Sequence, residues 1–197
     1  MNKFILLIPF LVFFACKGNK ATDDFSKTVS NVETKLKTSV NIFTESRTDE
    51  LVSPRSVANG EVLMVPARDW TSGFFPGELW FMYELTNDSY WREKALEFTL
   101  PLESEKWNGR THDMGFKMYC SFGKAFQFTK KKEYFNVLVQ SAKTLATRFK
   151  PNVGCIRSWD HNADKWDFPV IIDNMMNLEL LFWAARETGN EMYKEIA

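Results

Sequence analysis

The 197-residue sequence has no excess of charge of either sign, because 25 lysines and arginines balance 25 aspartates and glutamates. It holds only three cysteines and two histidines, and its basic residues form no stripe. The missing stripe argues against a nucleic-acid partner, and the short lysine cluster at 130–132 is typical of a solvated turn. No cysteine or histidine spacing is typical of a zinc site, so we predict no metal and no cofactor.

No apolar run is long enough to cross a bilayer. The N-terminal run from Phe4 to Ala15 follows Lys3 and ends before Cys16, which predicts a secretory signal peptide over residues 1–15. A cysteine directly after the cut predicts lipidation at Cys16, with a plain secreted protein or an uncleaved anchor as alternatives. Polar residues 16–25 then predict a tether, followed by one domain over residues 26–197.

These features predict an exported lipoprotein, periplasmic or anchored in the outer membrane of a Gram-negative bacterium. Its only membrane contact would be the lipid at Cys16. Two further cysteines remain, Cys120 and Cys155. They could form one disulfide in an oxidising compartment or stay as two buried free thiols, and the sequence leaves both open.

Apolar residues at a three-to-four spacing predict helices over about 26–48, 78–85, 90–100, 122–149 and 178–197. The last two are interrupted by short polar turns, whereas residues 51–77, rich in proline and glycine, predict a long irregular connection. Thr86, Thr129 and Thr188 are each followed five residues later by an aromatic, and a second helix then begins. This degenerate repeat predicts an all-α fold of helical hairpins, with a site among the long loops.

Asp173 lies inside a nearly unbroken apolar run at residues 168–178. An ionised carboxylate is costly to bury, so the group must be hydrogen-bonded, paired or kept protonated. A protonated carboxyl is what a general acid requires. The alternative is an N-cap of the helix that begins near Leu178, and the local pattern does not separate the two.

Asp113 is the natural partner of Asp173, because two nearby carboxylates separate an acid role from an anionic one. A turn or N-cap is its alternative role. Asp69 is better explained as an ion-paired or capping residue. His112 favours a hydrogen-bonding position in the site, and His161 stays undecided.

Trp70 and Trp159 each lie in a polar loop and are candidates for stacking on sugar rings, with core packing as the alternative. Trp107 and Trp166 are weaker candidates of the same kind. The remaining tryptophans fall on helical stripes and are predicted to be core residues: Trp80, Trp91 and Trp183.

The motifs of this chain resemble those of glycoside hydrolase family 88, the unsaturated glucuronyl hydrolases. They are PRS at 54–56, DWTSGFFPG at 69–77, LW at 79–80, THDMGF at 111–116 and VIIDNMMNL at 170–178. They run in family order and cover nearly all of the chain after residue 26. The resemblance implies an (α/α)6 barrel, which this chain is too short to complete, so we expect a truncated barrel that is inactive alone.

The resemblance also implies a substrate, an oligosaccharide left by a polysaccharide lyase with a 4,5-unsaturated glucuronic acid at its end. The family releases this sugar from glycosaminoglycan fragments by hydrating the C4=C5 enol ether. Carried onto this chain, Asp173 would be the acid and base, and Asp113 would hold the ring hydroxyls. Trp70, His112 and Trp159 would shape the sugar site.

Two alternatives remain at the level of sequence. One is a sister (α/α)6 family that acts on unsaturated galacturonyl–rhamnose fragments. The other is a helical glycan-binding lipoprotein without catalysis, which would have no need of both Asp113 and Asp173. The preferred glycan, its sulfation and the oligomeric state stay open.

Overall fold

The computed structural model describes residues 20–197, so the predicted signal peptide, residues 1–15, and the lipidation residue Cys16 lie outside the described residues. The chain divides into two compact units, one ending at Leu36 and one running from Lys37 to Ala197. Helix α1 (Lys20–Ser46) begins earlier than predicted. Residues 20–25 of the expected tether are therefore helical.

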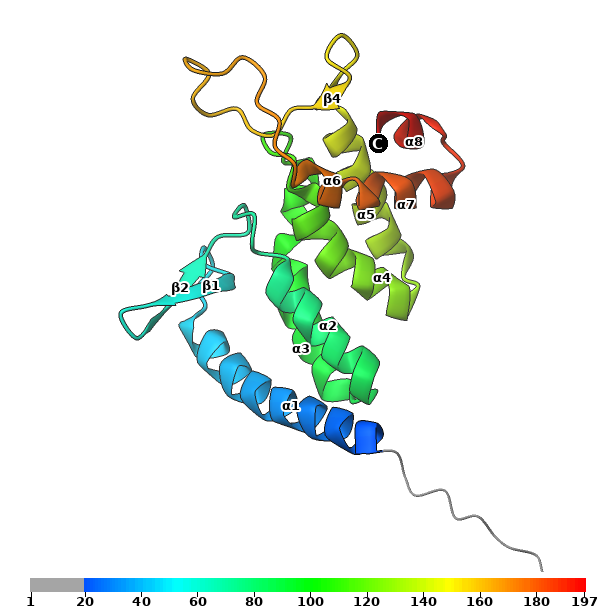
Figure 1. Ribbon diagram of the computed structural model, residues 1–197. Coiled ribbons are helices and arrows are strands. Elements are labelled where there is room, and N and C mark those ends of the chain that lie inside the picture. The colour runs from blue at the N-terminus through cyan, green and yellow to red at the C-terminus, as the bar shows by residue number, and fades with distance from the viewer. Residues whose placement is uncertain (1–19) are drawn as a thin grey trace, which may run out of the picture. The chain divides into compact units, whose positions relative to one another are not determined.

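Helical hairpins dominate the second unit, as the sequence predicts (Figure 1). They are α2 (Phe74–Thr86) with α3 (Ser89–Thr99), α4 (Lys124–Thr129) with α5 (Lys132–Ala146), and α7 (Glu179–Thr188) with α8 (Met192–Ile196). A 3₁₀-helix η1 (Leu100–Trp107) continues α3, a π-helix η2 (Gly115–Gly123) leads into α4, and a short α6 (Asn174–Asn177) leads into α7. Helical structure thus begins several residues before the predicted start of each hairpin, at Phe74 in α2, Gly115 in η2 and Asn174 in α6.

The three hairpin turns share one hydrogen-bonding pattern, which confirms the predicted repeat. In each, a threonine hydroxyl donates to the carbonyl four residues earlier, at 2.7 Å for Thr86 and 2.6 Å for Thr129 and Thr188. The next residue is left-handed in each turn: Asn87, Lys130 and Gly189, with φ of 54°, 53° and 69°. The aromatic five residues after the threonine is buried in every case.

The long connection after α1 is not wholly irregular, contrary to prediction. It contains an antiparallel hairpin of β1 (Ser53–Ala58) and β2 (Glu61–Val65). Asn59 and Gly60 form its turn with φ of 53° and 82°, and two consecutive left-handed residues are what a tight two-residue hairpin requires. A second small hairpin pairs β3 (Phe149–Lys150) with β4 (Cys155–Ile156).

The hydrophobic core lies among α2, α3, η2, α5 and α7. Trp80 is fully buried there, stacks on Phe128 with ring centroids 5.8 Å apart, and donates its Nε1–H to the Thr99 hydroxyl at 3.1 Å. Trp91 and Trp183 are buried as well, at 0% and 5% exposure. The prediction that these three tryptophans are core residues is confirmed.

The apolar run around Asp173 is not buried, contrary to what its composition suggests. Ile172, Met175 and Met176 expose 81%, 65% and 66% of their surface. They lie on or just before α6, and no described element covers them. Among residues 20–197, moreover, no helix has both the length and the apolar character needed to span a membrane.

Both described cysteines are free thiols. Cys120 lies in η2 and Cys155 in β4. Burial raises the pKa of the Cys120 thiol to about 11, so it stays protonated and weakly nucleophilic at neutral pH. Of the two alternatives left open by the sequence, the structure therefore has the free thiols.

Candidate active site

Three long loops carry the predicted site residues, and each loop precedes the first helix of a hairpin. Trp70 comes before α2, His112 and Asp113 before η2, and Trp159 and Asp173 before α6. Because all three loops lie at the N-terminal ends of their helices, they meet at one end of the hairpins. The structure brings all five predicted residues to the lining of one cavity of about 390 Å³.

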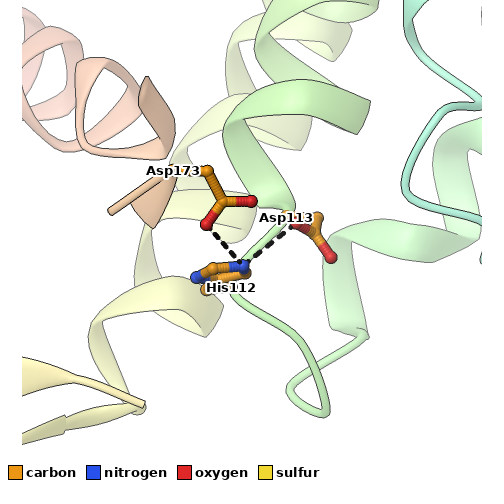
Figure 2. A group of neighbouring side chains, drawn as sticks. All are labelled: His112, Asp113 and Asp173. Atoms are coloured by element: carbon orange, nitrogen blue, oxygen red, sulfur yellow. Dashed lines mark ion pairs between the residues drawn. The ribbon is translucent and has the colours of Figure 1, made fainter. Parts of the chain in front are cut away.

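His112 is the centre of this cluster (Figure 2). Its Nε2 atom lies 3.2 Å from Asp113 Oδ1 and 3.5 Å from Asp173 Oδ1, so the imidazole stands between two carboxylates. The ring is 2% exposed, whereas the side chains of Asp113 and Asp173 are 17% and 38% exposed. His112 is therefore buried and not a surface residue, and its part in binding a sugar stays a prediction.

Asp173 occupies the position before α6, yet its side chain caps no backbone N–H of that helix. Its Oδ1 atom is buried and accepts no hydrogen bond, and its nearest ionisable neighbour is His112. Capping, the alternative role for Asp173, is therefore wrong. A carboxyl with a buried, unbonded oxygen and a partly exposed side chain is available to exchange a proton with a ligand.

Asp113 is held as an anion. Burial raises the pKa of its carboxyl, but hydrogen bonds from His112 and Thr111, together with the charges of His112 and Lys117, outweigh burial and bring the pKa below its ordinary value. Lys117 is fully buried, and its Nζ lies 2.6 Å from Glu105 Oε2. The two aspartates thus have different surroundings, as separate roles require.

Ser158 joins the second loop to the third. Its carbonyl accepts the His112 N–H at 3.0 Å, and its own N–H donates to Pro169 O at 2.8 Å. Its hydroxyl accepts the Ile171 N–H at 3.1 Å. A single β-bridge between Thr111 and Trp159 lies beside it. Since Ser158 is fully buried, these bonds fix the backbone on which His112 and Asp173 stand.

Asn177 links the backbone after Asp113 to the backbone of Asp173. Its Oδ1 accepts the Phe116 N–H at 2.9 Å, and its Nδ2 donates to the Asp173 carbonyl at 3.4 Å. Its side chain is fully buried. A Cβ at Gly115 would come within 2.6 Å of Asn177 Cα, so glycine is needed for this close approach. The π-helix that follows Asp113 is thereby attached to the helix that follows Asp173.

The two loop tryptophans differ in exposure. Trp70 is 46% exposed, with edge contacts to Phe74 and Phe116 at 5.9 and 6.1 Å between centroids. Trp159 is partly buried and stacks on His161, with centroids 5.2 Å apart and planes 14° apart. The core alternative is therefore excluded for Trp70, whose face is open to a sugar ring.

Comparisons with known proteins agree with this geometry. The chain is 47% identical over 182 residues to the unsaturated glucuronyl hydrolase of Formosa agariphila, a match that covers 92% of this chain and 45% of that protein. It is 31% identical over 133 residues to the unsaturated chondroitin disaccharide hydrolase of Streptococcus pneumoniae, covering 66% and 33%. No protein-family model matches the chain.

The fold agrees as well. A crystal structure of an unsaturated glucuronyl hydrolase specific for heparin superposes with a TM-score of 0.76 at 43% identity, over 88% of this chain and 46% of that one. The chain belongs to the unsaturated glucuronyl hydrolases of glycoside hydrolase family 88. The predicted all-α, (α/α)6-barrel fold class is thereby confirmed, and the chain spans less than half the length of these relatives.

The structure also shows the surroundings of the other residues singled out in the sequence. Asp69 accepts from Arg55 at 3.0 Å, so the predicted ion pair is confirmed, and it also accepts the Thr71 N–H at 2.9 Å within a turn. His161 lines the cavity. Trp107 and Trp166, at 65% and 47% exposure, are not among its lining residues.

Sequence reasoning missed Arg110 and Ser158, which also line the cavity. Ser158 gives no signal in the sequence, since its role depends on bonds between distant loops. Arg110 stands two residues before His112 and could have been noticed as a basic residue beside the acidic pair. A larger cavity of about 580 Å³ lies along the later turns of α2, α4 and α7, but it contains none of the predicted site residues.

His112, Asp113 and Asp173 each offer a ligand atom, and these atoms all lie within 4.8 Å of one another. This spacing would allow a metal ion among the described residues. In the structure Asp113 Oδ1 and Asp173 Oδ1 face His112 Nε2 at 3.2 and 3.5 Å. The prediction of no metal stays a prediction.

Proposed function

We propose that the chain forms part of an enzyme that removes 4,5-unsaturated glucuronic acid from glycosaminoglycan oligosaccharides produced by lyases. The observation that carries this proposal is the placement of Asp113 and Asp173 on either side of the buried His112 Nε2. Family membership supports it, since two relatives are named for unsaturated glucuronyl substrates and chondroitin disaccharides, and a solved one for heparin.

The proposed reaction is hydration of the C4=C5 enol ether. Asp173 gives its proton to C4, and the resulting carboxylate takes a proton from a water molecule as that water adds to C5. The product is a hemiketal at C5, which opens to a ketone and frees the hydroxyl at C1. The hemiacetal at C1 then releases the next sugar. The carboxyl ends the hydration protonated, as it began.

Each neighbour of Asp173 has a task in this scheme. Asp113, held ionised by Thr111, His112 and Lys117, accepts hydrogen bonds from ring hydroxyls. His112 orients both carboxylates through one nitrogen atom. Trp70 offers an exposed face for the sugar ring, and a cavity of about 390 Å³ is within the range typical of small-ligand sites.

The test is loss of the ultraviolet absorbance of the C4=C5 bond with unsaturated chondroitin and heparin disaccharides. It uses the 197-residue chain and a chimera that continues from Ala197 with the matching part of the Formosa agariphila relative. Asp173→Asn should reduce turnover by about 10³-fold or more, because it removes the only acid and base of the scheme. Asp164→Asn, an exposed aspartate of the same loop, is the matched control.

Three results would contradict the proposal or its mechanism. If neither protein bleaches any unsaturated uronide but both bind it, the non-catalytic glycan-binding alternative takes its place. If only unsaturated galacturonyl–rhamnose fragments are consumed, the sister activity replaces the glucuronyl one. Equal activity of Asp173→Asn and the wild type would remove Asp173 from the mechanism.

We also propose that the protein is an exported lipoprotein, with a signal peptide over residues 1–15 and a lipid on Cys16. The support is the sequence of Lys3, the apolar run from Phe4 to Ala15 and the cysteine that follows it. Cys16→Ser should move the protein from the membrane fraction of a Gram-negative host to the soluble periplasmic fraction. An unchanged distribution would exclude lipid anchoring at this residue.

A further inference from the structure

The site is rich in carboxylates, and most of the nearby arginines are already paired. Asp69 binds Arg55 at 3.0 Å, and Asp160 binds Arg148 at 3.0 Å and Arg157 at 3.6 Å. These pairs neutralise the carboxylates that flank the cavity. Asp113 and Asp173, which face the cavity itself, both lie against His112, and neither forms an ion pair with an arginine among the described residues.

Arg110 stands apart from this pattern. It lines the same cavity as Asp113 and Asp173, is exposed, and forms no ion pair or side-chain hydrogen bond with the described residues. Its backbone is well held, because its N–H donates to Asn108 Oδ1 at 3.2 Å and the preceding carbonyl, of Gly109, accepts from Arg148. The structure therefore fixes where the side chain starts. The charge of the guanidinium reaches Asp160, but the group itself forms no ion pair or hydrogen bond with the described residues.

A free guanidinium beside two carboxylates suits an anionic ligand. A saccharide that carries a carboxylate or sulfate would be repelled by Asp113 and Asp173, and an unpaired cation in the same cavity offsets that repulsion. The planar guanidinium also matches the two oxygens of a carboxylate or sulfate, so that it can donate two parallel hydrogen bonds. The cavity also has two histidines: His112 lies between the two carboxylates, and the His161 ring is stacked on Trp159.

We propose that Arg110 is the anion-binding residue of this site and receives a carboxylate or sulfate of the oligosaccharide. This assignment rests on the proposed function for its substrate class, and it adds a residue that determines which substituents the cavity accepts. Arg68 is the competing position, because it lines an adjoining cavity of about 490 Å³ with Trp70 and Asp113 and likewise has no partner among the described residues.

The test is calorimetric binding of three unsaturated disaccharides to the 197-residue chain, its Arg110→Gln and Arg110→Lys variants, and the control Arg92→Gln, an exposed arginine of α3. The ligands are an unsulfated disaccharide, its 6-sulfated form, and the unsulfated form with its carboxylate reduced to an alcohol. Arg110→Gln should raise Kd for a charged ligand by roughly tenfold or more, the size of a charge-assisted hydrogen bond. Arg110→Lys should restore only part of this.

The three ligands identify the anion. If Arg110→Gln loses the same affinity for the unsulfated and the 6-sulfated disaccharide and none for the carboxylate-reduced one, Arg110 binds the uronate carboxylate. A loss confined to the sulfated ligand assigns it to the sulfate. In either case the wild-type Kd should rise with added salt more steeply than that of Arg110→Gln.

The inference is overturned if Arg110→Gln binds all three ligands like the wild type, if Arg68→Gln alone shows the loss, or if the wild type binds no charged ligand. Circular dichroism melting of each variant separates a binding loss from misfolding. Failure of the proposed function looks different, since the charged disaccharide then binds through Arg110 while its C4=C5 absorbance persists.

Discussion

His112 owes its place to a backbone that comes from two loops. Its N–H donates to the Ser158 carbonyl, and its Nε2 faces carboxylates from two loops, the one before η2 and the one before α6. Removing the hydrogen-bond partner of a buried polar group is costly. The residues that hold the site are therefore expected to matter for stability as well as for chemistry.

Asn177→Leu tests this expectation. The substitution keeps the volume but leaves the buried Phe116 N–H without its acceptor, which should lower the free energy of unfolding by about 1–3 kcal/mol. Urea denaturation measures the loss. Asn136→Leu, at an exposed position of α5, should change it little. Equal stability of Asn177→Leu and the wild type would mean that the bond to η2 contributes nothing.

Asp160 gives the stability a dependence on pH. Hydrogen bonds from Arg148 are the main reason that the pKa of Asp160 lies below its ordinary value, with the charges of Arg148, Arg157 and Arg110 adding to the effect. A lowered pKa means a contribution that is present above the unfolded value of about 3.9 and is lost as pH falls through the folded value. Asp113 adds a contribution of the same sign.

Asp160→Asn should therefore have a lower free energy of unfolding than the wild type at pH 7. The difference between the two proteins should become smaller as the pH is lowered below about 4. Urea midpoints at pH 7 and pH 3 measure this difference at each pH. Asp164→Asn is the control and should show no difference at either pH. A difference of the same size at both values would show that the Asp160 ion pair is not its cause.

At the scale of the element, the three hairpins are variations on one turn. In each, the first helix ends with a threonine whose hydroxyl donates to the carbonyl four residues earlier, and a left-handed residue follows. In two of the turns, Asp88 and Asn190 then accept the backbone N–H two residues later with their side chains. Left-handed backbone costs an ordinary residue about 1–2 kcal/mol, whereas glycine adopts it freely. Among the three turns only α7–α8 uses glycine, at Gly189.

Gly189→Ala should accordingly lower the free energy of unfolding by about 1 kcal/mol through backbone strain alone. A Cβ at this position meets nothing within 4 Å, so no steric clash contributes. Gly189→Asn should lose less, because Asn87 holds the same place in the α2–α3 turn. Thermal melting compares the variants. An asparagine variant less stable than the alanine one would argue against equivalent turns.

At the scale of the whole molecule, local patterns in the sequence predict the helices and the turns between them. The threonine repeat and the three-to-four spacing are local signals, and the structure follows them. The helix starts were placed too late because Phe74, Gly115 and Asn174 open helices with residues typical of loops. The Asn59–Gly60 turn was overlooked within a stretch rich in proline and glycine.

The sequence predicts which residues form the candidate site, but it does not predict the contacts between them. Asp113, Asp173 and His112 stand out by residue type beside glycines and aromatics. That one nitrogen of His112 faces both aspartates depends on Ser158 and Asn177, whose partners lie far away in the chain. The same holds for Arg110, whose importance is visible only once Arg55, Arg148 and Arg157 are found in ion pairs.

The arrangement of short turns and long loops has a practical consequence. Helix α2 contains 13 residues, which corresponds to a length of about 20 Å between the Trp70 loop and the Asn87 turn. A fluorescent label or a surface linker attached at that turn would lie well away from the loops that line the cavity. Under the proposed function, the protein could then be immobilised as a detector of lyase products, with these loops directed toward the sample.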